Sequence, residues 1–404
     1  MSALIRRAAV TGAVVALGVA TLAACGSSSN SNTNAGGNPS SGGSAAGGIT
    51  AACKLTSPPT SGASMPKSVN LGKTSGKVGV ILPDTTSSTR YTLYDKPLLT
   101  KALTDAGIQA DVENAQGDKN KFASIAQNMI NEGDKVLIID SIDAASGAGV
   151  EKAADQAGVK VIDYDRVNLG GTAPYYVSFD NEDVGKLQAQ ALLDCLKQQG
   201  VTQPNIIEMD GGTDVDNNAV LFKKGAQEVF QQAGVTPVAD ETVLGWTVSN
   251  AAPAFQQALT QANGQVDGVL AANDDIANAV IGVLKDQGLA GHVAMTGQDA
   301  AVEGIQNIIS GQQSMTVFKD VKLEAQAAAQ LAIALIEGKD PASAGMTLSK
   351  FTDPQSPSHN IQALLLPAEV ITQANVEDVV KAGALKAADI CKGLESQCSS
   401  LGIQ

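Results

Sequence analysis

The stretch "KVLIIDSIDAASGAGVEKAADQAGVKVIDYDR", residues 135–166, contains two short apolar runs, KVLIID and VKVIDY, that a longer segment separates. Similar runs recur at residues 77–82, 205–210, 267–272 and 292–297. Segments with apolar residues at helical spacing lie between them, and they are suited to bury one face each. Near-continuous apolar strands joined by helices are typical of parallel sheets covered on both faces. The sequence therefore predicts an α/β fold.

The length of the chain indicates two such sheets. It has 404 residues, 44% of them apolar, which exceeds one ordinary hydrophobic core. Residues 175–185, "YYVSFDNEDVG", interrupt the rhythm and are expected to cross between two lobes. A second crossing between the lobes is expected at residues 314–320, and a long helix is expected to follow it over residues 321–336. The remainder, from Pro341, is rich in Pro, Ser and Asp, which predicts a wrapping tail.

The N-terminal segment has the features of an export signal. Arg6 and Arg7 precede an apolar run too short to span a membrane comfortably, and "LAAC" ends at Cys25. This resembles a bacterial lipobox, which implies residues 1–25 as signal peptide and Cys25 as lipid anchor; the alternative is an incidental cysteine beside a cleavage site. A Gly/Ser/Asn-rich tether is expected at residues 26–70, because the stretch that follows Cys25, residues 26–48, has almost no apolar side chain to order it.

Four further cysteines suggest disulfides in an exported protein: Cys53, Cys195, Cys391 and Cys398. Four cysteines allow three pairings, and Cys391 with Cys398 is expected because the two are close in sequence. For Cys195 a buried free thiol is an open alternative, since it shares the apolar face of a predicted helix.

Charge and motif content exclude several function classes. The net charge is -14 without any run of Lys and Arg, so no nucleic-acid partner is expected. "LGKTSG" lacks the early Gly of a phosphate-binding loop, and "DVDNN" is followed by Ala219 where a calcium loop needs Gly. The only histidines, His292 and His359, are far apart and carry no motif. We expect no metal and no cofactor.

Polar and aromatic side chains recur after the predicted strands. In open α/β sheets the ligand lies beyond the carboxyl ends of the strands, so these positions are candidate contacts. The candidates are Arg90, Tyr91, Arg166, Asp216, Asn218, Trp246, Asn273, Asp299 and Lys319. Each also has a structural interpretation as helix N-cap, solvated surface charge or core aromatic.

Taken together, these residue types favour a neutral polyhydroxy ligand over a phosphate. Carboxylates, amides and cations offer fixed partners for neighbouring hydroxyls, and an aromatic face packs on the C–H side of a sugar ring. Trp246, the only tryptophan, is the candidate stacking platform. Residue types alone leave sugar hydrolysis open, because Asp216 and Asp299 could share one cleft.

Seven motifs, among them "VIDYDR", "DVDNNAVLFKKGA", "AAND" and "MTVFK", resemble the periplasmic xylose-binding proteins and related multiple-sugar-binding lipoproteins of bacterial ABC importers. The resemblance spans about residues 77–383 in order. It implies two Rossmann-like lobes joined by a three-segment hinge, one bound sugar and no catalysis. It also implies that the nine candidates contact the sugar, although the family usually has Trp where this chain has Tyr91.

The resemblance and the crossing points together predict the domain plan. Residues 77–180 and about 319–342 form the first lobe, and residues 181–318 and about 343–404 form the second lobe and tail. The expected function is capture of xylose or a related aldose by a membrane-anchored monomer outside the cytoplasm, with delivery to an ABC permease. The alternatives are a receptor that presents its sugar complex to a sensor protein and, less favoured, a secreted glycosidase. A sugar-responsive transcription factor would need a DNA-binding headpiece where this chain has a signal.

Overall fold

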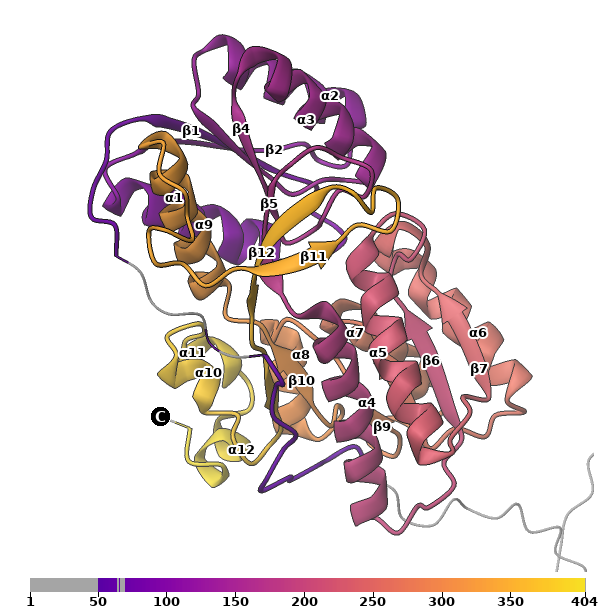
Figure 1. Ribbon diagram of the computed structural model, residues 1–404. Coiled ribbons are helices and arrows are strands. Elements are labelled where there is room, and N and C mark those ends of the chain that lie inside the picture. Colours follow the sequence, from indigo (N-terminus) through magenta and orange to yellow (C-terminus); the bar gives the residue numbers. More distant parts are fainter. Residues whose placement is uncertain (1–49, 64, 66–69, 404) are drawn as a thin grey trace, which may run out of the picture. The chain divides into compact units, whose positions relative to one another are not determined.

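The computed structural model describes residues 50–63, 65 and 70–403. Cys25 and the predicted signal lie outside these residues. Two mainly parallel sheets, each with helices on both faces, form the core of the described part (Figure 1). The α/β prediction is thereby confirmed. No helix within the described ranges is long and apolar enough to cross a membrane.

The first lobe contains a seven-stranded sheet in the order β11-β12-β5-β4-β3-β1-β2, parallel except for β11. Its strands are β1 (Lys77–Leu82), β2 (Gln109–Asn114), β3 (Val136–Ile139), β4 (Lys160–Tyr164), β5 (Tyr175–Phe179), β11 (Ser349–Thr352) and β12 (Asn360–Leu366). Its helices are α1 (Lys96–Asp105), α2 (Lys119–Asn131), α3 (Ala144–Ala157) and α9 (Val321–Ile336).

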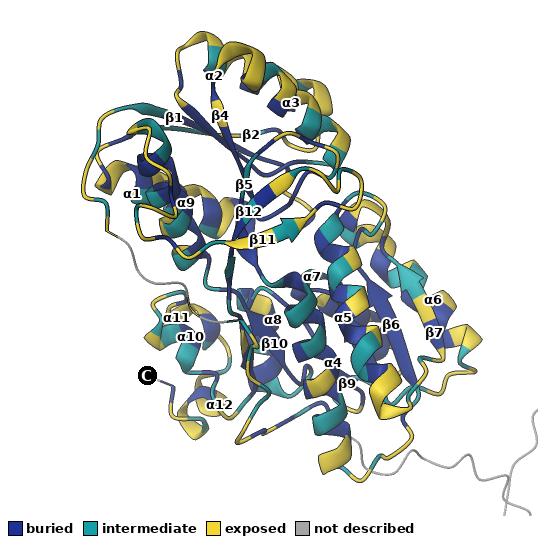
Figure 2. Ribbon diagram, viewed as in Figure 1, coloured by how far each residue is buried: buried dark blue, intermediate teal, exposed yellow. Residues whose placement is uncertain are grey.

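Alternation along the strands divides the core of the first lobe between its two faces. In β3, Val136 and Ile138 belong to the apolar cluster that includes α1 and α9, whereas Leu137 and Ile139 belong to the cluster with α2 and α3. Figure 2 shows the strands buried and the outward helix faces exposed. A sheet covered on both faces needs apolar residues at every position, which is what made these runs recognisable.

The second lobe has a four-stranded parallel sheet in the order β7-β6-β8-β9. Its strands are β6 (Ile206–Asp210), β7 (Ala239–Thr242), β8 (Gly268–Ala271) and β9 (Ala294–Met295). The helices are α4 (Asn181–Gln198), α5 (Asn217–Ala233), α6 (Ala251–Gln261), α7 (Asp274–Asp286) and α8 (Val302–Ser310). An antiparallel pair, β10 (Thr316–Phe318) and β13 (Glu369–Ile371), continues this lobe, followed by α10 (Asp378–Lys381), α11 (Ala387–Ile390) and α12 (Glu395–Ser400).

The chain crosses between the sheets three times: between β5 and α4, between β10 and α9, and between β12 and β13. The first two crossings lie where the sequence predicted them. The third corrects the predicted boundary, because residues 343–366 were expected in the second lobe. Instead, β12 pairs in parallel with β5, so this segment completes the first sheet. Proline and serine around "NIQALLL" obscured a strand whose own residues are largely buried.

The segment before the first strand corrects a second expectation. Residues 50–63 were expected in a disordered tether, but Ala51, Cys53 and Leu55 are buried. The N–H of Ala51 donates to the carbonyl of Gly291 at 2.9 Å. This segment therefore packs on the folded body.

Two disulfides join the four cysteines of the described chain. Cys391 is bonded to Cys398, which is the pairing expected from the sequence. Cys53 is bonded to Cys195, so the alternative of a free buried thiol at Cys195 is wrong. The second bond ties the segment before the first strand to α4.

Candidate functional site

The loops after the strands of both lobes meet around one cavity, which contains about 280 Å³ of space including its mouth. All nine candidates from the sequence line it: Arg90, Tyr91, Arg166, Asp216, Asn218, Trp246, Asn273, Asp299 and Lys319. They come from both lobes, as the rule for strand ends predicts.

In the first lobe, Arg90 is held by three carboxylates. Its Nε and Nη2 donate to Asp95 at 2.8 and 2.7 Å, Nη2 also donates to Glu324 at 2.7 Å, and Nη1 donates to Asp165 at 3.1 Å. Arg90 is only 2% exposed. Burial alone would lower its pKa, but the three carboxylates raise it well above the ordinary value. Most of its donors are therefore used inside the protein, and its main effect is to order this wall.

Tyr91 and Asp165 form the next part of the same wall. The Tyr91 hydroxyl donates to Oδ2 of Asp165 at 3.1 Å, and the guanidinium of Arg166 lies 5.6 Å from the centre of the tyrosine ring. Burial alone would raise the pKa of Asp165, but Arg90, Lys319 and Arg166 hold it below the ordinary value. Asp165 is therefore ionised and can accept hydrogen bonds from hydroxyls.

In the second lobe, Asp216 orients the tryptophan. Its Oδ1 accepts from the N–H of Asn218 at 2.9 Å and caps α5, while its Oδ2 accepts from the indole N–H of Trp246 at 3.0 Å. The ring lies against Gly211 and Gly212, where an added Cβ would come within 2.0 and 2.7 Å of indole atoms. Two glycines after β6 are therefore what admits the ring into the wall.

Asn273 and Asp299 complete the second-lobe wall, and Lys319, at the crossing between β10 and α9, lies beside them. Asn273 caps α7 through Oδ1, which accepts from the N–H of Ile276 at 2.9 Å. Lys319 lies 3.0 Å from Oδ1 of Asp299 and 5.8 Å from the ring centre of Phe222. Helix capping and a place in the cavity wall thus coexist in Asn273, as they do in Asp216.

Three cavity residues have left-handed backbones: Asp165, Trp246 and Asp299, with φ of 58°, 56° and 89°. Tryptophan and aspartate adopt this conformation at a cost, which surrounding contacts must offset. Such conformations concentrate at ligand sites, and here they set the direction of three side chains in one cavity wall.

Direct contacts join the two lobes around the cavity. Ser88 donates to Asp299 at 3.0 Å, and the N–H of Thr89 donates to Asp275 at 3.2 Å. The Nδ2 of Asn218 donates to the backbone carbonyl of Asp165 at 2.8 Å. The lobes are therefore closed over the cavity. Asp275, in the first turn of α7, supplies the acceptor for one of these contacts.

Five further residues line the cavity beside the nine candidates. They are Ser87, Ser88, Asp165, Phe222 and Gln298. Asp165 and Gln298 also follow predicted strands, next to Arg166 and Asp299, but were not among the nine candidate contacts. Phe222 lies four residues after Asn218 on α5, and helical spacing places the two on one face. The serines carry no such signal.

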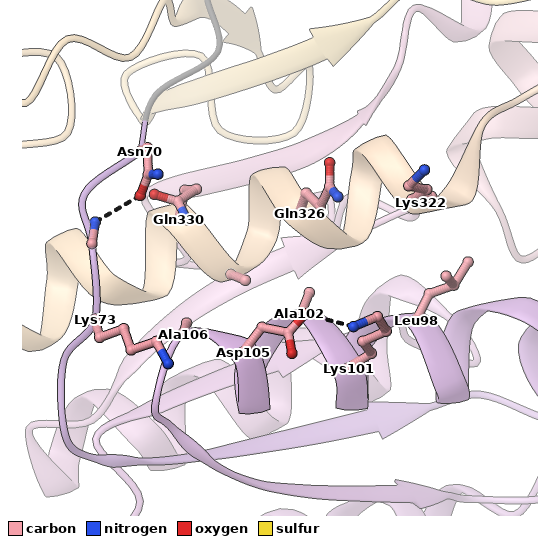
Figure 3. A pocket seen from close by; sticks show the side chains of 12 residues that line it. Asn70, Lys73, Leu98, Lys101, Ala102, Asp105, Ala106, Lys322, Gln326 and Gln330 are labelled. Carbon is pink, nitrogen blue, oxygen red and sulfur yellow. Dashed lines mark hydrogen bonds and ion pairs between the residues drawn. The ribbon is translucent and has the colours of Figure 1, made fainter. Parts of the chain in front are cut away.

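A larger pocket lies between α1 and α9, with about 1,240 Å³ of open space (Figure 3). Lysine and glutamine side chains lie along it, and Lys101 is paired with Asp105 at 2.7 Å. None of the nine candidates lines it. Among the described residues, no group of three or more His, Cys, Asp or Glu is placed to hold a metal ion.

Two α/β lobes closed on a small polar cavity, with three crossings between them, define the class of two-lobed binding proteins. Residues 78–340 match the model of the periplasmic binding protein domain, and the chain belongs to that family. It is a binding protein and not an enzyme, so the Asp216 and Asp299 carboxylates do not serve hydrolysis.

Relatives extend over most of the chain. The D-xylose-binding periplasmic protein of Escherichia coli (strain K12) is 38% identical over 301 residues, covering 73% of this chain and 87% of that protein. The multiple sugar-binding periplasmic receptor of Rhizobium radiobacter is 30% identical over 358 residues, covering 84% of this chain and 98% of that protein. A crystal structure of a carbohydrate transporter solute binding protein from Chloroflexus aurantiacus with D-glucose has a TM-score of 0.69 at 29% identity, covering 78% of this chain and 98% of that one.

Proposed function

We propose that this protein binds xylose or a related aldose in the cavity between its lobes and delivers it to the permease of an ABC importer. The observation that carries the proposal is the gathering of all nine candidates around one small closed cavity. The names of the relatives support the sugar class, and two of them are D-xylose-binding periplasmic proteins, 38% and 34% identical to this chain. In this proposal the nine residues are the sugar contacts, and Trp246 supplies the stacking face.

An unused polar atom in the cavity wall gives the sugar a partner. Oε1 of Gln298 lines the cavity, is buried and has no hydrogen-bond partner among the residues described. A buried group left unpaired costs about 1–3 kcal/mol, so a hydroxyl that reaches it is favoured. The same cost penalises a sugar whose hydroxyl points elsewhere, and stereochemical selectivity follows.

The protein functions outside the cytoplasm, as its periplasmic relatives do. We further propose that Cys25 is acylated and anchors the protein to the membrane, and that residues 26–49 form the tether. In this proposal the protein acts as a monomer whose first lobe is residues 77–180 and 319–366. Because one relative is called a receptor, presentation of the sugar complex to a sensor protein is a second role to test.

Calorimetric titration of the purified protein with xylose, glucose, arabinose and galactose tests the proposal. We expect saturable one-site binding of at least one aldose, with a free energy of about -8 kcal/mol at micromolar affinity. Incubation with an aryl glycoside should release no product. Absence of binding by all four sugars would contradict the proposed ligand class.

A further inference from the structure

Asp140 is a buried carboxyl group that the proposed sugar contacts leave unused. It follows β3 in the first lobe and is 0% exposed. Neither of its oxygens has a hydrogen-bond partner among the residues that the structure describes. Its nearest cation is Arg166, whose Nε lies 3.8 Å from Oδ1. Burying a carboxylate without hydrogen-bond donors costs free energy, so a functional role for Asp140 would explain why it is placed here.

Arg166 lies between Asp140 and a carboxylate of the other lobe. Its Nη1 and Nη2 donate within the first lobe, to the carbonyl of Ser141 at 3.1 Å and to the hydroxyl of Ser87 at 3.3 Å. Its Nε is 3.3 Å from Oδ2 of Asp216, which belongs to the second lobe, and is therefore closer to Asp216 than to Asp140. With the lobes closed, the second-lobe carboxylate has the shorter contact.

We propose that Asp140 is a positioning residue that opposes closure, because Arg166 pairs with Asp140 when the lobes open and with Asp216 when they close. This inference rests on the proposed function, in which the lobes open to exchange sugar. Opening carries Asp216 away with its lobe and returns Arg166 to Asp140. Closing draws Arg166 toward Asp216 and leaves buried Asp140 without a hydrogen bond and with only a 3.8 Å contact to Nε of Arg166, which favours release of the sugar.

The charges around Asp140 give this exchange a pH dependence. Arg90 and Asp95 face it from the segment after β1, together with the Tyr91 ring, and Asp165 and Arg166 face it from the end of β4. Burial and then Asp165 raise the pKa of Asp140 in the closed form, against Arg166 and Arg90. An Arg166 partner in the open form lowers that pKa, so closing takes up a proton and binding weakens as pH rises.

The test is Asp140→Asn, which removes the charge and keeps the shape. At pH 8 we expect its Kd for xylose to be at least about fivefold lower than that of the wild type. The difference between variant and wild type should shrink as the pH is lowered to 5.5, because protonation of Asp140 in the closed form removes the charge that opposes closure. Asp134→Asn is the matched control, because Asp134 is also buried and without a hydrogen-bond partner in the described chain, but it lies before β3 at the opposite edge of the sheet. It should leave the Kd unchanged.

The outcomes separate this inference from the proposed function. If the wild type binds xylose and Asp140→Asn binds equally or more weakly at pH 8, the inference is wrong. If the wild type binds none of the aldoses, the proposed function fails instead. Should the variant not fold, calorimetry of the wild type in buffers of different ionisation enthalpy decides: net proton uptake on binding supports the inference, and zero uptake or release overturns it.

Discussion

The indole N–H of Trp246 donates to Oδ2 of Asp216 at 3.0 Å, and the same oxygen lies 3.3 Å from Nε of Arg166 in the other lobe. One carboxylate therefore orients the only tryptophan and contacts the opposite wall of the cavity. Movement between the lobes would alter the contact of this carboxylate with Arg166, and with it the charge beside the ring. The proposed stacking face and the contact between the lobes are therefore coupled through Asp216.

This coupling makes Trp246 a reporter of the site. Because the chain has a single tryptophan, a change in its emission on adding xylose comes from this position. Trp246→Ala should raise the Kd at least about tenfold, because it removes the apolar face against the sugar, while Trp246→Phe should lose less. Fluorescence titration checks the emission change, and calorimetry checks the Kd of the two variants. Unchanged emission during calorimetric binding, with full affinity in Trp246→Ala, would exclude the stacking role.

Asp275 should affect affinity without affecting selectivity. It accepts from the N–H of Thr89 across the lobes at 3.2 Å but does not line the cavity. Asp275→Ala should raise the Kd about 2- to 10-fold for every sugar that binds, because it removes one closing contact. Asp286→Ala, at the exposed end of the same helix, is the control and should bind like the wild type. A change in the order of sugar preference would contradict this assignment.

The strands that the sequence predicted share one physical property. β1, β3, β4, β6, β8 and β9 are flanked on both faces by helices, and their apolar runs are nearly unbroken. β2, "QADVEN", is an edge strand with no fully buried residue, so it lacks that signal. β12 is buried but follows a segment rich in Pro and Ser, which suggested a tail.

Which residues line the cavity was predictable, because the ends of parallel strands meet at one edge of a sheet. Which side chains contact each other was not predictable, because that depends on their placement in three dimensions. The sequence puts Arg166 and Asp216 fifty residues apart, and nothing local relates them to each other or to Asp140. Likewise the partner of Cys195 lies 142 residues away, in a segment whose Gly- and Ser-rich surroundings suggested disorder.

The two disulfides should differ in their effect on stability. Cys53–Cys195 closes a loop of sequence separation 142, and Cys391–Cys398 one of only 7. In the chain-entropy account, the longer loop contributes about 4–5 kcal/mol and the shorter one about 2–3. Replacing each pair with alanines and measuring urea unfolding should show the larger loss for Cys53 and Cys195. An equal or smaller loss for that pair would show that the segment before β1 adds little to the fold.

Glu208 is a fully buried carboxyl group on β6 and does not line the cavity. Neither of its oxygens has a hydrogen-bond partner in the described ranges, and Asp210 lies two residues along the same strand. Burial, and then the Asp210 carboxylate, raise the pKa of Glu208 to about 8. Burial also raises the pKa of Asp210 to about 7, against its salt bridge with Lys223.

The sign of the resulting pH dependence follows from these directions. The ordinary pKa of glutamate is about 4.3, so between that value and about 8 the folded protein holds a proton that the unfolded chain releases. The stabilisation is complete below the lower value and is lost as pH rises through the upper one.

Glu208→Gln should therefore unfold a few degrees higher than the wild type at pH 9 and at about the same temperature near pH 4.5. Glu113→Gln on the exposed edge of β2 is the control, and its unfolding temperature should follow the wild type at both pH values. A wild-type midpoint that rises between pH 6 and pH 9, or a Glu208→Gln midpoint below it at pH 9, would show that Glu208 is ionised and paired in the folded state.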